Sequence, residues 1–240
     1  MSPIRQTQAS GADASVTRHE ATIREGSWFR NLPDAMQARM LEAARPRHLD
    51  DGQRLFARGD ASDGLYCVIE GTVRLTGSLR GGQEALLGAL QPVQWFGEVA
   101  LIDGAGRAYD AWADGPTLLL QVAHDPMIAI LDATPGGWPA MAALLARRTR
   151  LAFLAVEESA MLPAIGRVAR RLLALADGYG DHLQPLGTVR VPQERLAAML
   201  ALSRQTVNRA LKQLEAQGAI RLARGGTELV DVERLREIGQ

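Results

Sequence analysis

The chain has 240 residues, of which 47% are hydrophobic, with 27 basic and 27 acidic side chains. This length suits two modest domains. No run approaches the ~18 consecutive apolar residues of a membrane span, and the N-terminus lacks the apolar segment of a secretory signal. We therefore expect a cytoplasmic protein without a membrane partner. The single cysteine, Cys67, excludes intrachain disulfides and four-thiolate iron–sulfur clusters.

The charge is unevenly distributed along the chain. Residues 164–240 contain 12 Lys and Arg against 8 Asp and Glu, whereas the rest of the chain contains 15 against 19. An acidic part followed by a basic part is typical of a sensor domain joined to a domain that binds nucleic acid.

The N-terminal half begins with residues 1–25, whose small and polar side chains predict a disordered tail. Residues 34–44 then have the pattern of a short amphipathic helix. From residue 47 to about residue 120, short apolar runs alternate with turn glycines, which predicts an antiparallel sandwich or barrel. Cys67 lies in one of these apolar runs, where we expect a small core residue.

A long helix is predicted from residue 138 to residue 162, because apolar residues recur there at three- and four-residue spacing. Pro163 ends this helix or begins the next one. Two interpretations stay open: a core helix, or a parallel coiled coil with a second copy of the chain. We favour the coiled coil, with contacts through Met141, Leu145, Arg148, Leu151, Ala152, Ala155 and Leu162.

The C-terminal part continues with a helix at residues 166–177 and a short strand at residues 188–191. Two helices follow, at about residues 193–200 and 204–216, and then a hairpin that turns at Gly225 and Gly226. The order helix, helix, hairpin is typical of a winged helix.

Residues 193–212 have the pattern of a helix-turn-helix. The inward faces of its two helices are apolar and consist of Leu196, Ala197 and Leu200 on the first, and Val207, Ala210, Leu211 and Leu214 on the second. Ser203 can cap the second helix, whose outward face is polar and basic like that of a recognition helix. We expect duplex DNA to contact Ser203, Arg204, Gln205, Asn208, Arg209 and Lys212.

Two details depart from the usual helix-turn-helix. The turn residue is Ala201 instead of glycine, which costs ~1 kcal/mol if its backbone is left-handed. The first helix opens with Pro192 and has Arg195 where an acidic capping partner is usual.

Together these segments resemble the CRP/FNR family of transcription regulators, over about residues 28–238. Residues 56–60 and 63–74 look like the family's β-roll, and residues 95–103, followed by Arg107, look like its phosphate-binding cassette. At the recognition helix, Gln205 stands where the family often has glutamate.

The resemblance implies an α+β fold in three parts. These are a jelly-roll-like antiparallel β-roll of the cyclic-nucleotide-binding type at residues 26–135, a dimerisation helix and hinge at residues 136–163, and a winged helix-turn-helix at residues 164–240. It also implies a homodimeric, sequence-specific transcription regulator on near-palindromic DNA, which contacts RNA polymerase if it activates transcription.

The cassette implies an effector pocket. Gly97 lets the backbone approach an anion, and a short helix from Glu98 to Asp103 would direct its N–H groups at a phosphate. Glu98 could accept a hydrogen bond from a ribose hydroxyl, and Arg107 could pair with a cyclic phosphate. The expected effector-binding residues are Gly97, Glu98, Val99, Ala100, Arg107 and Ala108. In the alternative interpretation, Glu98 and Arg107 only pair with each other and the pocket binds nothing.

Departures from the family pattern argue against cyclic AMP. Ala108 replaces a serine that donates to phosphate, and Asp110 adds negative charge nearby. Ala152 and Phe153 replace the hydroxyl side chains that contact adenine in a cyclic-AMP responder. Cyclic AMP stays a less favoured choice beside another nucleotide or small anion, or no ligand. The sequence therefore indicates no certain cofactor, with a cyclic nucleotide or other small anionic effector as the possible one.

An enzyme is not predicted, because the chain has no nucleophile elbow, Walker loop, dinucleotide fingerprint or HExxH motif. The histidines, His19, His48, His124 and His182, lack the spacing of metal ligands. Two alternative functions stay open. One is a cupin-like β-barrel enzyme, which would need a histidine cluster, and the other is a protein-interaction module whose winged helix does not bind DNA.

Overall fold

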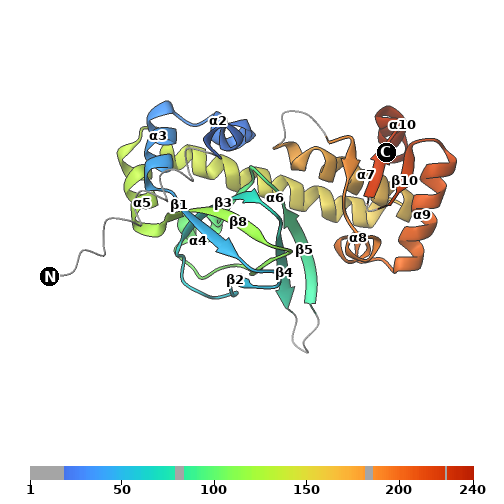
Figure 1. The fold of residues 1–240 in the computed structure, drawn as a ribbon, viewed down its shortest axis with the longest axis horizontal. Helices are drawn as coiled ribbons and strands as arrows, with labels where there is room; N and C mark the ends of the chain where they lie inside the picture. The colour runs from blue at the N-terminus through green and yellow to red at the C-terminus, as the bar shows by residue number, and fades with distance from the viewer. Residues whose placement is uncertain (1–18, 79–83, 182–185, 225) are drawn as a thin grey trace. The chain divides into compact units, whose positions relative to one another are not determined.

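The computed structural model describes residues 19–78, 84–181, 186–224 and 226–240 (Figure 1). They form two compact units, one of the residues up to Ser78 together with Leu87–Arg147, and one that contains Arg148–Gln240. The boundary between the units falls inside the long helix α6 (Gly137–Met161), which the sequence analysis treats as a segment of its own.

The N-terminal unit contains the predicted β-roll, built from two antiparallel sheets of four strands each. The first sheet has the order β1-β8-β3-β6, with β1 at Arg45–Leu49, β8 at Thr117–Ala123, β3 at Gly64–Glu70 and β6 at Trp95–Phe96. The second has the order β2-β7-β4-β5, with β2 at Arg54–Phe56, β7 at Asp110–Ala113, β4 at Val73–Ser78 and β5 at Glu84–Leu90.

Strand β3 divides the core of this unit, because its side chains alternate between the two faces of the sheet. Tyr66 and Val68 point between the two sheets, where they pack with Phe56 and Phe96. The alternate residues pack against the helices that cover the other face, and Cys67, which is fully buried, is among them. The prediction of Cys67 as a core residue is therefore confirmed.

Short helices and the first part of α6 lie along the outer face of the first sheet (Figure 1). They are a helical segment at residues 19–25, α2 at Ser27–Arg30, α3 at Asp34–Ala43 and α5 at His124–Ala133. The predicted tail is wrong at residues 19–25, since this segment is helical and Ile23 is completely buried. Residues 1–18 of the predicted tail lie outside the described residues.

The helices α5 and α6 are joined by a sharp bend. In the part of the chain that the structure describes, no single helix is long and apolar enough to cross a membrane, and only α5 and α6 together, bent by 117°, pass that test. Met141 and Leu144 of α6 are buried in the core between the first sheet and the helices on its outer face. The first turns of α6 therefore serve as a core helix.

The C-terminal unit has the predicted winged-helix order. Its helices are α7 (Ala164–Ala176), a short 3-10 turn (Gly178–Gly180), α8 (Gln193–Leu200), α9 (Arg204–Ala216) and α10 (Val232–Ile238), the last of which was not predicted. Its sheet has the order β10-β11-β9, with β10 at Ile220–Ala223, β11 at Gly226–Leu229 and β9 at Thr188–Val189. Of the predicted hairpin turn, Gly225 lies outside the described residues.

Helices α8 and α9 meet through the apolar faces that the sequence predicts. Leu196, Ala197 and Leu200 of α8 are buried, as are Val207, Ala210, Leu211 and Leu214 of α9. Helix α7 packs against both, and the guanidinium of its Arg167 donates to the carbonyl oxygen of Leu200 at the end of α8. The recognition helix is thus held on its inner side, which leaves its outer side open.

Candidate functional site

The first turn of α9 is fixed by a side-chain cap. The Oγ of Ser203 accepts a hydrogen bond of 3.1 Å from the backbone N–H of Thr206. This bond satisfies one of the N–H groups that the start of a helix leaves free. The predicted cap is confirmed, and it sets the helix register in which Arg204 and Gln205 open the outer face.

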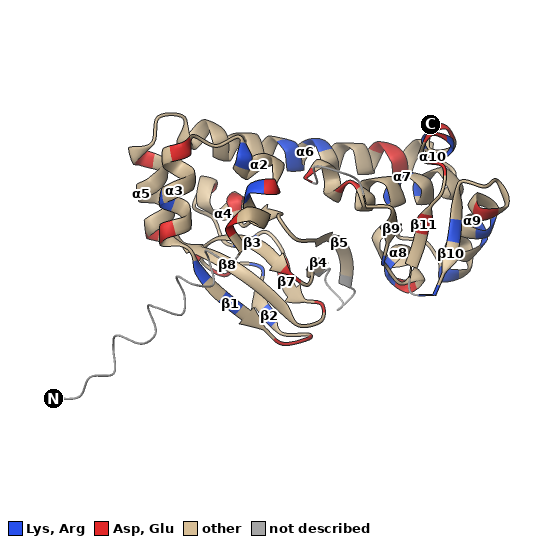
Figure 2. Cartoon of the chain, turned by 45° about the horizontal axis from the view of Figure 1, so that its top comes forward, with Lys and Arg blue, Asp and Glu red and all other residues tan. Residues whose placement is uncertain are grey.

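The outer face of α9 carries four exposed side chains among the predicted DNA contacts: Arg204, Gln205, Arg209 and Lys212. Figure 2 shows basic residues along α9 and on the neighbouring strand β10. Arg204 is not isolated there, because its Nη1 lies 2.9 Å from Oε1 of Glu194 on α8. Both side chains are largely exposed, so water screens this pair strongly and a phosphate can compete for Arg204.

Asn208 differs from its four neighbours. It is half-buried, and its Nδ2 donates a hydrogen bond of 3.0 Å to Oε1 of Gln193 on α8. Its amide is therefore partly used inside the protein rather than fully directed outward. Gln193 and Glu194 were missed by the sequence analysis, since no local pattern links them to residues on α9 that lie ten or more positions away.

The turn between α8 and α9 has the strained geometry that the sequence analysis anticipated. Ala201 has φ 50° and ψ 42°, in the left-handed region. A residue with a Cβ pays for this conformation by ~1 kcal/mol relative to glycine. The neighbouring N–H of Leu202 donates to the carbonyl of Ala197 at 3.0 Å, which holds the turn in place.

The wing formed by β10 and β11 adds basic residues beside α9. Arg221 of β10 pairs with Glu228 of β11 across the hairpin, with Nη1 and Oε2 2.9 Å apart. Arg224, which follows β10, is exposed. The wing therefore offers a cation close to the tip of the hairpin.

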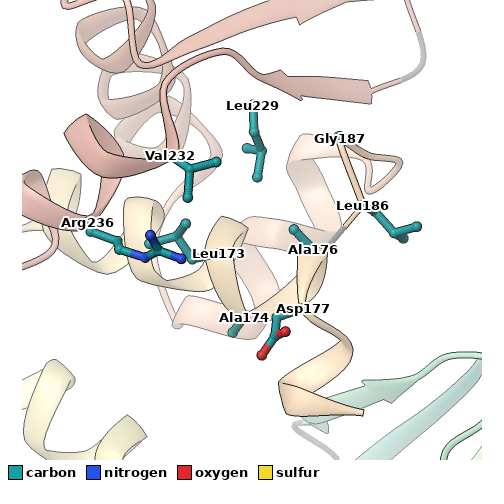
Figure 3. Close-up of a pocket in the computed structure, with 9 residues that line it drawn as sticks. All are labelled: Leu173, Ala174, Ala176, Asp177, Leu186, Gly187, Leu229, Val232 and Arg236. Carbon is teal, nitrogen blue, oxygen red and sulfur yellow. The ribbon is translucent and has the colours of Figure 1, made fainter. Parts of the chain in front are cut away.

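A cavity of about 330 Å³ lies elsewhere in the C-terminal unit (Figure 3). It is lined by residues of α7, α10, β11 and the segment before β9, namely Leu173, Ala174, Ala176, Asp177, Leu186, Gly187, Leu229, Val232 and Arg236. None of these belongs to α8 or α9, so the cavity is separate from the candidate DNA surface.

In the β-roll, the guanidinium of Arg107 is almost completely buried and makes several contacts. Its Nη2 pairs with the carboxylate of Asp63 and donates to the carbonyl of Gly64 at 2.9 Å, and its Nη1 donates to the carbonyl of Gly97 at 3.1 Å. The ring of Phe56 lies 4.3 Å from its central carbon. Arg107 thus pairs with Asp63 and not with Glu98, so the pairing in the alternative interpretation is wrong, whereas a pocket that binds nothing stays a prediction.

Asp63 is the centre of a polar cluster that sequence reasoning missed. Its carboxylate accepts a hydrogen bond from the hydroxyl of Tyr66 and lies 3.7 Å from Nη1 of Arg47. Gln121 donates to its backbone carbonyl at 2.9 Å. Burial, followed by the hydrogen bond to Asp63, raises the pKa of the Tyr66 hydroxyl well above its ordinary value. Asp63 is thus an internal anion for Arg107.

Glu98 begins the predicted helix α4 (Glu98–Asp103), which the structure confirms. Its side chain is 2% exposed, and its Oε2 has no hydrogen-bond partner among the described residues. The Nε of Arg107 is also buried without a partner there. Buried polar atoms cost free energy unless they are hydrogen-bonded, so this pair of atoms fits a polar ligand that brings a hydroxyl to Glu98.

The pocket itself is narrow. A cavity of about 10 Å³ remains between Phe56, Gly97, Val99, Ala100, Arg107, Ala108 and Tyr109, which is about the smallest space that holds one water molecule. A Cβ on Gly97 would come within 2.7 Å of Nη1 of Arg107, so glycine is needed there for the arginine to approach. This space is far smaller than a nucleotide, so a nucleotide would enter only after some of the lining side chains move.

The sequence also predicts that Asp110 adds charge near the pocket and that Ala152 and Phe153 of α6 replace hydroxyl side chains there. The Oδ1 of Asp110 accepts a hydrogen bond of 3.1 Å from the backbone N–H of Arg58, and it alternates along β7 with the buried Ala111 and Ala113. Its charge is therefore directed away from the space between the sheets. On α6, Ala152 and Phe153 are exposed.

The predicted contact residues of the dimer fall into two groups. Met141 is completely buried in the core of the N-terminal unit, so its assignment to an interface is wrong. The remaining six are exposed or half-buried: Leu145, Arg148, Leu151, Ala152, Ala155 and Leu162.

Among the described residues, no group of three or more His, Cys, Asp or Glu side chains could hold a metal ion, and His182 lies outside them.

Comparison with known families assigns both units. Residues 46–134 match the cyclic nucleotide-binding domain, and residues 166–238 match the Crp-like helix-turn-helix domain. The chain is 38% identical over 187 residues to the cyclic AMP receptor protein of Thermus thermophilus, an alignment that covers 78% of this chain and 84% of that protein. It is 29% identical over 211 residues to a CRP-like cAMP-activated global transcriptional regulator of Mycobacterium tuberculosis, which covers 86% and 93% of the two chains.

Solved structures share the fold. FixK2 from Bradyrhizobium japonicum superposes with a TM-score of 0.73 at 22% identity, over 82% of this chain and 98% of that one. A CRP/FNR family regulator from Thermus thermophilus gives a TM-score of 0.62 at 26% identity, over 81% and 98% of the two chains. The Mycobacterium tuberculosis relative is a global transcriptional regulator. With a capped recognition helix, a cyclic nucleotide-binding fold and these relatives, the chain belongs to the CRP/FNR family of DNA-binding transcription regulators.

Proposed function

We propose that the protein is a cytoplasmic homodimer that binds near-palindromic duplex DNA through α9, and that a small anionic effector in the β-roll controls its affinity. It acts as a regulator and catalyses no reaction. The observation that carries the proposal is the outer face of α9, where Ser203 caps the helix and Gln205, Arg209 and Lys212 are exposed. Such a face suits the major groove. If the protein activates transcription, RNA polymerase is the further partner we propose.

Dimerisation is supported by the second half of α6, whose apolar side chains are unusually exposed. Phe153 is 70% exposed and Val156 is 67% exposed. With Ala152 they lie at three- and four-residue spacing, and therefore on one stripe of the helix. A helix stripe of this kind is stable in water when a second helix covers it. The proposed interface is centred on this stripe and excludes Met141; the other predicted contacts lie beside the stripe, namely Leu145, Arg148, Leu151, Ala155 and Leu162.

The effector is supported by the chemistry of the β-roll pocket. Arg107 supplies a cation for an anionic group, and the unpartnered Oε2 of Glu98 can accept from a hydroxyl. A cyclic nucleotide has both groups, and the relatives described above include a cyclic AMP receptor protein. Because Asp63 already pairs with Arg107 and Phe56 and Tyr109 narrow the pocket, binding must displace part of this arrangement. The proposal is therefore a cyclic nucleotide or related anion that opens the pocket, with no commitment to cyclic AMP.

Selection from a random duplex library tests the DNA-binding part. The protein should select two inverted half-sites about one helical turn, ~34–36 Å, apart. Sedimentation at micromolar concentration should show a dimer, which Val156→Glu weakens. Leu154→Glu places the same side chain at another exposed apolar position of α6, on the side of the helix away from this stripe, and should leave the dimer intact. A monomeric wild type, or a selected pool without any shared motif, would contradict this part of the proposal.

A thermal-shift series with cyclic nucleotides, cyclic dinucleotides and inorganic phosphate tests the effector part. A ligand that binds only the folded state raises the melting temperature. Arg107→Ala should abolish this shift if the ligand occupies the β-roll. A shift that survives in the variant would locate the ligand elsewhere, and the cavity beside α10 would then be the next candidate.

A further inference from the structure

The junction between α6 and α7 interrupts the helical backbone. Helix α6 ends at Met161 and α7 begins at Ala164, with Leu162 and Pro163 between them. Proline has no N–H, so the hydrogen-bond ladder of α6 cannot continue through it. The last bond before it runs from the N–H of Leu162 to the carbonyl of Glu158, at 3.1 Å. The direction of α7 relative to the end of α6 therefore depends on side-chain contacts.

One arginine makes contacts on both sides of this junction. The Nε of Arg170 on α7 donates a hydrogen bond of 2.6 Å to the carbonyl oxygen of Gly239, at the end of α10. Its Nη1 lies 3.4 Å from Oε1 of Glu158 on α6. The Glu158 side chain is 18% exposed and that of Arg170 is 37% exposed, so water screens this contact less than it screens a fully exposed pair. Arg170 thus connects the last turn of α6 with the C-terminal helix.

Helices α7 and α10 provide a rigid base for Arg170. A Cβ on Gly239 would come within 2.9 Å of Cγ of Arg170, and a Cβ on Gly166 would come within 3.2 Å of the carbonyl oxygen of Ile238. The two helices therefore approach closely where glycine is present. Because α7 also packs against α9, a cation fixed at this place has a fixed relation to the recognition helix.

We infer that Glu158 and Arg170 are positioning residues that set the angle between α6 and the winged helix, and through it the spacing of DNA half-sites that the dimer accepts. The inference rests on the proposed dimer on palindromic DNA. In such a dimer, the two α6 helices hold the axis while each recognition helix reads one half-site. A looser junction would let each winged helix rotate and accept half-sites nearer or farther apart, without changing which bases α9 reads.

The test compares spacing preference with sequence preference. Palindromes that carry the selected half-site are prepared with the central spacer shortened or lengthened by single base pairs. Each base pair changes both the distance between the half-sites along the DNA and their relative rotation around the DNA axis. In the wild type, affinity should be concentrated at one spacing. In Glu158→Gln, the preference for that spacing over its neighbours should fall by about three- to fivefold, the effect expected for a modest ion pair. The preferred half-site sequence and the melting temperature should stay the same.

Glu157→Gln is the matched control, because it removes the same charge one position earlier, from an exposed side chain of α6. Arg170→Lys is a second test variant that keeps the charge but has a single nitrogen for two contacts, and it should broaden the spacing profile as well. An unchanged profile in Glu158→Gln, or equal broadening in Glu157→Gln, overturns the inference. A wild type that shows neither a dimer nor a shared half-site overturns the proposed function itself, and this is seen before any variant is compared.

Discussion

The buried guanidinium of Arg107 pairs with the carboxylate of Asp63, a residue 44 positions earlier in the chain. Arg107 enters the pocket from the segment before β7, and Asp63 lies directly before β3. In the closed pocket, Asp63 therefore provides the negative charge that an effector phosphate would otherwise provide. Any anion that binds Arg107 has to compete with this carboxylate or share the guanidinium with it.

Replacement of Asp63 should reveal how much the pair stabilises the fold. Asp63→Asn leaves the buried cation of Arg107 with carbonyl partners only, so we expect the free energy of unfolding to fall by about 1–3 kcal/mol. Arg47→Gln is the control. Its guanidinium lies 3.7 Å from Asp63 but is 44% exposed, and the change should cost less than about 0.5 kcal/mol. Denaturant unfolding measures both, and a larger loss in the control would show that Asp63 serves Arg47 instead.

The phenol of Tyr66 should make the fold sensitive to alkaline pH. Its pKa is raised by burial and by the hydrogen bond to Asp63, so the folded state holds a proton that the unfolded chain releases near pH 10. The stability that this raised pKa contributes is fully present below pH 10, and the free energy of unfolding should fall as the pH rises above 10. Between pH 6 and 8 this phenol should cause no change.

Ultraviolet titration of phenolate checks this expectation. At least one of the three tyrosines should stay un-ionised until the protein unfolds in alkali. Tyr66→Phe should remove that delayed step and flatten the loss of stability above pH 10. If all three tyrosines ionise together in the folded wild type, then in solution the Tyr66 hydroxyl is neither buried nor hydrogen-bonded to Asp63 as the structure shows.

The helix-turn-helix was predictable because its signals are local. The observed bounds of α8 and α9 agree with the predicted ones, since the apolar spacing and the cap at Ser203 all lie within a short stretch. The pairs Asp63–Arg107 and Gln193–Asn208 could not be predicted, because they depend on how distant segments fold together. Periodicity along α6 likewise indicates an apolar stripe without indicating its partner, and Met141 packs into the chain's own core.

The turn between α8 and α9 should be improved by glycine. Ala201 has a left-handed backbone with φ 50°, and Ala201→Gly relieves its steric cost, so we expect the free energy of unfolding to rise by about 0.5–1 kcal/mol. The same change at the exposed Ala198, within α8, should lower it by about 0.5–1 kcal/mol. Thermal unfolding of the two variants compares the same alanine-to-glycine change at a left-handed residue and at a residue inside an α-helix. A loss of stability in both would mean that strain at Ala201 is negligible.

The base preference of the protein should depend on Gln205. Glutamine can donate and accept, as adenine requires, whereas glutamate accepts from cytosine. Gln205 is exposed on the first turn of α9, and Gln205→Glu should therefore change the preferred base pair at one position of each half-site. Selection from a random duplex library compares the two proteins. Identical selected motifs would exclude a base contact by Gln205.

Arg209 should contact a guanine rather than a phosphate. It lies one helical turn beyond Gln205 on the exposed face of α9, where a guanidinium can bind guanine O6 and N7 together. Arg209→Ala should then cost about 1–3 kcal/mol on the selected site and much less on random DNA. Lys212→Ala is the comparison, since it removes a cation from the next turn of the same helix. If Lys212 contacts phosphate, its loss weakens both kinds of DNA about equally.

Salt dependence separates the two roles independently of sequence. A lost phosphate contact reduces the slope of log affinity against log salt by about one, whereas a lost base contact leaves that slope nearly unchanged. Arg204 provides a comparison within the same protein, because its ion pair with Glu194 must open before Arg204 can bind a phosphate. Glu194→Gln removes that competing carboxylate. DNA binding should therefore become stronger, and more so at low salt than at high salt. If Arg209→Ala weakens selected and random duplexes to the same extent and also lowers the slope, Arg209 binds phosphate, and the specificity of the site must come from Gln205 and its neighbours.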